Sequence, residues 1–297
     1  MSALVSSAIR TVIWSIVVNG VLAAVKIVTG VFGNSYALIA DGIESVNDII
    51  ASVVVLISLK VSSKPPDEDH PFGHGKAEQL GALFSALSLL AAGGTIAWQS
   101  IHNLFTRHHS PEWFTLPVLV LVIITKEILS RYALKKSDET SSTALAGDAW
   151  HHRSDAITSG AAFIGIVIAL IGGDGYENAD DVAALVGCAV IFVNGFMLLK
   201  NAIHETMDGA PSQGVIDEVR AIAVGVGDVQ DVEKIRMKKI GLGYFMDLHV
   251  QVEPTLTVDE GHRIAHRVKD AILAAMPTVN DVVTHIEPFH PTRKRSV

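Results

Sequence analysis

The sequence predicts a membrane α-helical protein, in which six transmembrane helices are followed by a cytoplasmic α+β domain. Three observations predict this fold class. Residues 11–206 contain several long stretches almost free of charge, whereas residues 208–297 have the mixed composition of a soluble domain. Basic residues gather in alternate loops between the apolar stretches. We therefore expect a six-helix transmembrane domain at 1–207 and a cytoplasmic domain at 208–297.

The transmembrane prediction depends on the length of the apolar stretches. A spanning helix needs about 20 mostly apolar residues. Candidates of that length lie at about 9–32, 36–60, 79–105, 113–134, 145–171 and 181–203. Segments 79–101 and 182–199 contain no Asp, Glu, Lys or Arg, so their prediction is the strongest. The first, second, fourth and fifth candidates carry charges, and a soluble helical protein of two domains could also produce such a pattern.

The loops between these candidates indicate the orientation. If the N-terminus is cytoplasmic, Arg10 lies near the inner surface and the outside loops hold only Arg107. The inside loops then hold Lys60, Lys64, Lys76, Arg131, Lys135, Lys136 and Lys200. This is the positive-inside bias, which predicts that both termini are cytoplasmic. No cleavable signal peptide is evident, so we expect a bacterial plasma (inner) membrane protein.

The net charge and the cysteine content argue against a nucleic-acid-binding protein and against a cysteine-rich one. The formal net charge of −8 disfavours nucleic acid as a partner. The single cysteine, Cys188, rules out a disulfide framework or a cysteine-rich metal site. Because Cys188 lies in an apolar run, we expect it to pack as a small hydrophobic residue.

The C-terminal domain shows an α-β-β-α-β order that is ferredoxin-like in character. Thr257 and Glu260 form a capping-box motif, which opens a helix that continues to about Ala275. Pro277 ends this helix. The other expected elements are a helix at 213–224 and strands at 229–240, 244–253 and 279–287, the first two strands being joined by a Gly-Leu-Gly turn.

Acidic residues recur at helical spacing inside two apolar stretches. Steps of three and four place them on one face of each helix: Asp41, Glu44 and Asp48 in the second candidate span, and Asp148, His151 and Asp155 in the fifth. Ionisable groups at membrane depth are costly unless they are paired, solvated or bound to an ion. The four groups of Glu44, Asp48, His151 and Asp155 suit a tetrahedral Zn²⁺ ion. Asp41 and Asp148, one turn away, are expected to support the site or line a pathway. Alternatively, the acids face water or pair with Lys26 and Arg153.

The pairs Glu44-xxx-Asp48 and His151-xxx-Asp155 resemble the metal-binding motifs of the cation diffusion facilitator family. The resemblance covers almost the whole chain, including a histidine-containing first cytoplasmic loop. It implies a secondary transporter that exports divalent cations from the cytoplasm in exchange for protons. One departure is Glu44, because the family commonly has Asp or His there. With a histidine at position 151 the motif resembles that of zinc-type members, so Zn²⁺ is favoured over Fe²⁺, Mn²⁺, Co²⁺ or Cd²⁺.

The loop between the second and third candidate spans is a second candidate metal site. Three acids and two histidines lie close together in residues 65–76. The prolines and glycines of this segment are typical of a turning loop. The family resemblance implies Asp67, His70 and His74 as ligands. It also implies that Lys76 forms a charge interlock with Asp208 between the two domains. The alternative is a solvated loop that binds no ion.

The C-terminal domain is a third candidate. In similar proteins this region binds regulatory zinc and joins two chains, which implies a homodimer here. The positions that carry over are His249, His262, His285 and Glu287. Glu233 stands where a relative has histidine, which disfavours a bridged pair of ions. The alternative is a set of surface histidines without metal.

Other functions fit the residues less well. A membrane metalloprotease or phosphatase would also use His and Asp on helices, but the sequence contains no His-Glu-x-x-His or nucleophile motif. We therefore expect no enzymatic activity. The absence of a Walker loop disfavours ATP-driven pumping. A channel and a non-transporting membrane metal sensor remain as alternatives.

Overall fold

The computed structural model describes residues 3–32, 36–104, 115–172 and 179–290. The chain divides into two compact units, Met1–Ile203 and His204–Val297. The sequence places the corresponding boundary a few residues later, between 207 and 208.

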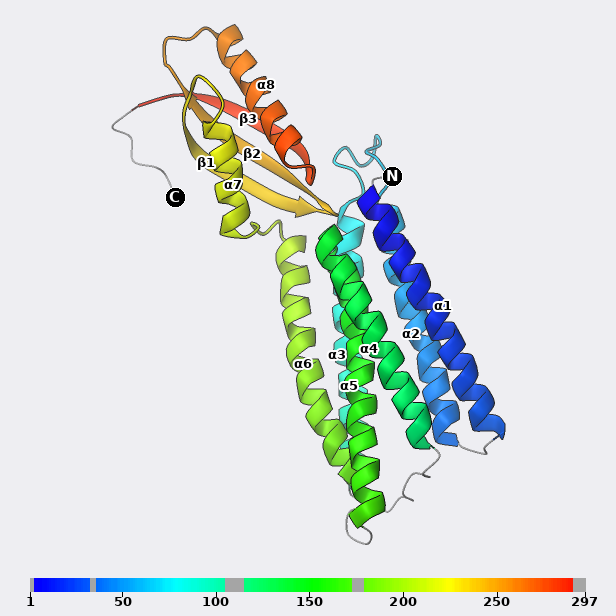
Figure 1. Ribbon diagram of the computed structural model, residues 1–297. Coiled ribbons are helices and arrows are strands. Elements are labelled where there is room, and N and C mark those ends of the chain that lie inside the picture. The colour runs from blue at the N-terminus through cyan, green and yellow to red at the C-terminus, as the bar shows by residue number, and fades with distance from the viewer. Residues whose placement is uncertain (1–2, 33–35, 105–114, 173–178, 291–297) are drawn as a thin grey trace. The chain divides into compact units, whose positions relative to one another are not determined.

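Long helices make up the first unit in the described residues, and they run side by side (Figure 1). Their bounds are α1 (Ala3–Phe32), α2 (Tyr36–Ser62), α3 (Lys76–Leu104), α4 (Thr115–Thr140), α5 (Thr143–Gly172) and α6 (Ala179–Thr206). Within the described residues, three helical segments are long and apolar enough to cross a membrane, at Ser6–Val28, Lys76–His102 and Leu185–Thr206. The second includes the charge-free segment 79–101, and the third overlaps most of the charge-free segment 182–199.

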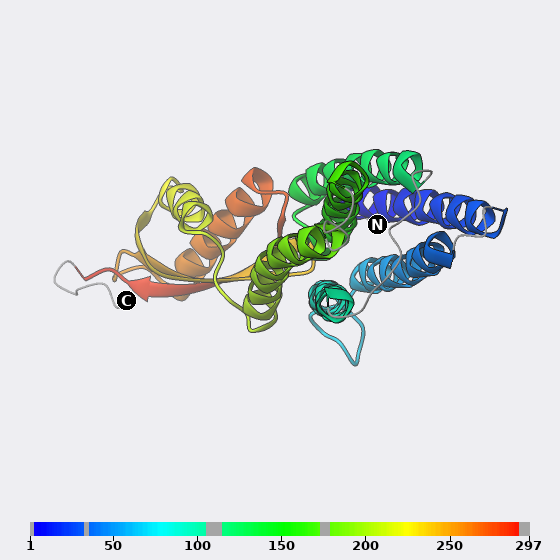
Figure 2. The ribbon, with the colours of Figure 1, turned by 90° about the horizontal axis from the view of Figure 1, so that it is seen from below.

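Helix α2 is in contact with α1, α3 and α5. Helix α5 also contacts α3 and α4, and α4 lies beside α1 (Figure 2). Two glycines bring the helices close together. A Cβ atom at Gly81 of α3 would lie 2.2 Å from Ser58 Oγ of α2, and one at Gly147 of α5 would lie 2.6 Å from Ser85 Cβ of α3. Small residues at such crossings are typical of helices packed in membranes.

The polarity of the first unit is reversed relative to a soluble protein. Large apolar side chains are exposed on its outer surface, as Trp98 and Val186 are. The interior instead contains buried ionisable groups, namely Lys26, Asp48, Glu78, Lys126, Asp148, His151 and His152. A soluble domain rarely buries such groups without partners. A lipid-facing exterior around a polar interior accounts for both observations.

The helices differ from the predicted spans mainly at charged ends. Helix α3 starts at Lys76 rather than 79, and α4 continues to Thr140 rather than 134. Hydropathy cannot find these turns because they are charged. In α4 the Lys136 Nζ and Glu139 Oε2 atoms pair at 2.5 Å, which supports the additional turn.

The second unit has the predicted α-β-β-α-β order: α7 (Gln213–Val224), β1 (Val229–Ile240), β2 (Gly243–Val252), α8 (Val258–Ala275) and β3 (Val279–Pro288). The sheet order is β1-β2-β3; β1 and β2 are antiparallel, and β2 and β3 are parallel with α8 as the crossover. Within the described residues, this is the ferredoxin-like β-α-β-β-α-β unit without its first strand. The predicted capping box at Thr257 and Glu260 is present.

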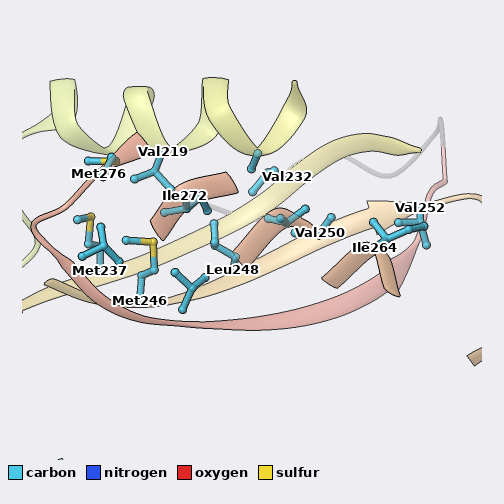
Figure 3. Close-up of a cluster of buried hydrophobic side chains, with 14 residues drawn as sticks. Val219, Val232, Met237, Met246, Leu248, Val250, Val252, Ile264, Ile272 and Met276 are labelled. Carbon is cyan, nitrogen blue, oxygen red and sulfur yellow. The ribbon is translucent and has the colours of Figure 1, made fainter. Parts of the chain in front are cut away.

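The core of this unit lies between the two helices and one face of the sheet (Figure 3). Leu248 and Val250 of β2 pack with Val219 of α7 and Ile272 of α8, all fully buried. Because side chains alternate along a strand, His249 of β2 lies on the opposite face. That open face carries the polar residues considered below.

Candidate metal centre

The first unit brings three of the predicted ligand residues together. Asp48 of α2 and His151 and Asp155 of α5 offer donor atoms that all lie within 4.8 Å of one another. His151 Nε2 lies 2.8 Å from Asp48 Oδ1. Asp48 and His151 are buried, and Asp155 is partly buried. Oxygen and imidazole donors gathered in this way are typical ligands of divalent transition metals.

The helical steps explain this convergence. His151 and Asp155 are four residues apart, so both project from one face of α5. Helix α2 packs against that helix and presents Asp48. The side chains of Glu44 and Asp41 lie outside the described residues, so their proposed roles stay predictions.

A lysine that sequence reasoning missed lies among these groups. Lys126 of α4 is 1% exposed, and its Nζ atom lies 3.0 Å from Asp48 Oδ2 and 2.7 Å from Asp155 Oδ2. Of the basic residues considered from sequence, Lys26 donates to Ser45 Oγ among its contacts, and Arg153 lies 3.8 Å from Glu127. The available signal was a single lysine within the apolar half of α4.

Asp148 lies in a neighbouring buried group rather than among the three donors. Its Oδ1 atom accepts a 2.6 Å hydrogen bond from Ser52 Oγ of α2, and its Oδ2 atom lies 3.6 Å from His152 Nε2. Asp148 and His152 are four residues apart, so they are neighbours one turn apart on α5. This group therefore joins α5 to α2 one turn from the candidate centre.

The start of α5 is fixed by hydrogen bonds from another helix. Ser142 is the N-cap, because its Oγ atom accepts from the Leu145 backbone N–H at 3.1 Å. The carboxylate of Glu78, in α3, accepts from Ser142 Oγ at 2.9 Å and from the Ala144 N–H at 2.8 Å. Glu78 is fully buried. It thereby sets the position from which α5 carries His151 inward.

The predicted loop ligands also lie together. Asp67, His70 and His74 offer donor atoms within 4.8 Å of one another. Asp67 Oδ1 accepts from the His70 N–H at 2.7 Å, and its Oδ2 atom lies 3.3 Å from His74 Nε2. The backbone hydrogen bond from His70, with the nearby imidazoles, lowers the pKa of Asp67. Gly73 adopts a φ of +79°, which lets the loop turn between the two histidines.

The open face of the sheet holds a third group. His249 Nδ1 lies 2.6 Å from Glu287 Oε1, and His285 Nε2 lies 3.6 Å from the same oxygen. These residues of β2 and β3 form a possible three-donor set. The predicted fourth residue, His262, is not in this set among the described residues. Helix α8 covers the other face of the sheet, and the His262 ring instead lies 4.5 Å from His266.

The predicted interlock between Lys76 and Asp208 joins residues of different units. Within its own unit, the Asp208 Oδ2 atom accepts from Lys238 Nζ at 3.1 Å. The pairing with Lys76 stays a prediction.

Comparisons with known proteins assign this arrangement to a family. Residues 12–207 match the family model described as the cation efflux transmembrane domain. Residues 211–289 match the cation efflux protein cytoplasmic domain. The chain therefore belongs to the cation diffusion facilitator family of membrane metal-efflux transporters, which the sequence motifs predicted.

Named relatives align with the chain over nearly its full length. The manganese efflux system protein MneP of Bacillus subtilis (strain 168) is 31% identical over 279 residues, covering 93% of this chain and 94% of its own. An uncharacterized transporter of Methanocaldococcus jannaschii, MJ0449, is 30% identical, covering 94% and 97%. The magnetosome protein MamB of Paramagnetospirillum magneticum is 28% identical, covering 93% and 92%. The family consists of transporters, and its substrates vary among members.

Proposed function

We propose that this chain exports divalent transition-metal ions, Zn²⁺ in the first place, from the cytoplasm in exchange for protons. The observation that supports this most is the buried meeting of Asp48 with His151 and Asp155, whose donor atoms lie within 4.8 Å. These residues belong to helices of the cation efflux domain. Glu44, one turn before Asp48, is the proposed fourth ligand.

The donor set favours zinc. Three carboxylates and one imidazole give four oxygen and nitrogen donors, a number and type that suit tetrahedral Zn²⁺. Mn²⁺ is the second candidate, because the relative MneP is named as a manganese efflux protein. Mn²⁺ prefers more oxygen ligands than this set provides, so water would complete its coordination.

Proton coupling follows from the chemistry of the proposed ligands. A metal ion binds deprotonated carboxylates and neutral imidazole, so binding and protonation compete for the same atoms. His151 is the proposed proton carrier, since an unperturbed imidazole titrates near neutral pH. Protons entering from outside the cell would then release the metal there, and metal from the cytoplasm would release the protons.

The remaining features of the proposal concern the whole protein. We propose that α1 to α6 all span the membrane, with both termini in the cytoplasm of a bacterial cell, as the positive-inside bias predicts. Two chains would associate through the C-terminal domain. The Asp67 group and the His249 group would bind regulatory metal, with Lys76 and Asp208 linking the two domains.

The test is metal flux in proteoliposomes under an imposed pH gradient. Asp48→Ala and Asp155→Ala should abolish metal-dependent proton flux while the protein still inserts and dimerises. Asp138→Ala removes an exposed carboxylate of α4 and serves as the matched control, with flux like the wild type. Wild-type flux in both site variants would refute the site assignment.

The same assay separates the alternatives. Zinc, iron, manganese, cobalt and cadmium are supplied in turn, and the ion with the highest kcat/KM identifies the substrate. A channel would conduct without saturation and without moving protons against a gradient. A sensor would bind metal and give no flux.

A further inference from the structure

Lys126 occupies the position from which a cation would contact the candidate centre. Its Nζ atom lies 3.0 Å from Asp48 Oδ2 and 2.7 Å from Asp155 Oδ2. These carboxylates come from α2 and α5, and the lysine comes from α4. One ammonium group therefore joins three helices, and its side chain is 1% exposed.

The contacts of Lys126 are incompatible with a metal ion on the same oxygens. Zinc binds carboxylate oxygen at about 2.0–2.2 Å, so an ion on these two oxygens would lie between the atoms that Nζ contacts. An ammonium group left beside a dication would be repelled strongly, because Coulomb energies are large where water is excluded. These two oxygens can therefore hold one cation or the other at a time.

The charges of the described groups match such an exchange. Asp48 and Asp155 provide two negative charges, and removing such charges from water is unfavourable unless a cation partners them. Lys126 stabilises both at once. A dication bound to Asp48 and Asp155 would stabilise both negative charges in the same way.

We propose that Lys126 is an internal competitor of the transported cation, which must displace its ammonium group from Asp48 and Asp155 in order to bind. The lysine thereby weakens metal binding and helps the site to release its ion. This inference deepens the proposed function and rests on it, because it takes Asp48 and Asp155 as metal ligands.

The experiment measures equilibrium binding of ZnCl₂, and separately of MnCl₂, to the detergent-solubilised full chain. In the background variant the loop and sheet groups are disabled by His70→Ala and His249→Ala. Lys126→Met keeps the length of the side chain and removes its charge. The apparent Kd should fall at least ten-fold. An unchanged or higher Kd would overturn the inference, and is what a purely structural lysine would give.

A matched control separates competition from a general charge effect. Arg153→Met removes a positive charge from α5 close to the centre, where Arg153 faces Glu127 and Trp150 rather than the two carboxylates. Its Kd should stay within two-fold of the parent protein. Equal tightening in both variants would overturn the inference. Asp155→Asn should abolish binding; if binding persists, the proposed function itself fails, whatever Lys126→Met does.

A measurement on the wild type keeps the test independent of the folding of any variant. Reductive methylation followed by mass spectrometry reports how readily each lysine reacts. Saturating ZnCl₂ should raise the labelling of Lys126 several-fold. Lys239 of the second unit is the internal reference. It is largely buried, its Nζ atom lies 3.0 Å from Glu205 Oε1, and its labelling should not change. Equal labelling of Lys126 with and without zinc would overturn the inference.

Discussion

Glu78 should stabilise the transmembrane domain although it lies outside the candidate centre. It is fully buried, and one carboxylate oxygen accepts from both Ser142 Oγ and the Ala144 N–H at the start of α5. Replacing Glu78 with alanine removes both bonds. It also leaves the buried Ala144 N–H without this acceptor.

The magnitude follows from these two bonds. A hydrogen bond to a charged group contributes about 1.5–3 kcal/mol net, and part of that gain is offset by the desolvation of the carboxylate. We therefore expect Glu78→Ala to lower the free energy of unfolding by about 2–4 kcal/mol. For a chain of this size the melting temperature should fall by about 3–6 °C.

Thermal unfolding in detergent, followed by intrinsic fluorescence, measures the effect. Glu78→Gln retains an oxygen acceptor and should cost about half as much. Glu68→Ala removes an exposed loop carboxylate and is the control, with an unchanged melting temperature. If Glu78→Ala melts within 1 °C of the wild type, the carboxylate does not anchor α5 and the reasoning is refuted.

Three further predictions concern other parts of the chain. Gly81→Ala should destabilise the α2–α3 contact by about 1–3 kcal/mol, because its Cβ would clash with Ser58; an unchanged melting temperature would contradict this. Lys269 lowers the pKa of Asp281, so their pair stabilises the second unit above about pH 4 and loses its effect as the pH falls further; Asp281→Asn should reduce this acid dependence in circular dichroism. His70→Ala should lower zinc stoichiometry without abolishing flux, and loss of all flux would place the loop in the transport pathway.

Much of the fold follows from local sequence patterns. The ends of β1 match the prediction residue for residue, because the glycine turn and the apolar alternation both mark them. The capping box likewise fixed the start of α8. Patterns of this kind act over a few residues, so one sequence suffices to detect them.

The pairing of the strands could not be read in the same way. That β3 pairs in parallel with β2 depends on how α8 crosses the sheet. It also decides that His249 and His285 share a face while His262 does not. The family resemblance implied all of these histidines as one group, and spacing along the chain cannot show which face of the sheet α8 covers.

Only part of the candidate centre could be predicted from the sequence. Spacing of four residues along α5 indicated that His151 and Asp155 share a face. The contact of Lys126 with Asp48 bridges 78 positions of the chain, and no periodicity reports such a distance. Glu78 was missed for a different reason. It accepts hydrogen bonds from the first residues of α5, and only tertiary packing brings those residues close to it.

X-ray absorption at the zinc edge tests the central claim most directly. The sample is the full chain carrying His70→Ala and His249→Ala, loaded with one equivalent of ZnCl₂. We predict a shell of oxygen donors with a single imidazole, and loss of bound zinc when Asp48 and Asp155 are both changed to alanine. A shell with several imidazoles, or zinc retained after both carboxylates are removed, would contradict the assignment.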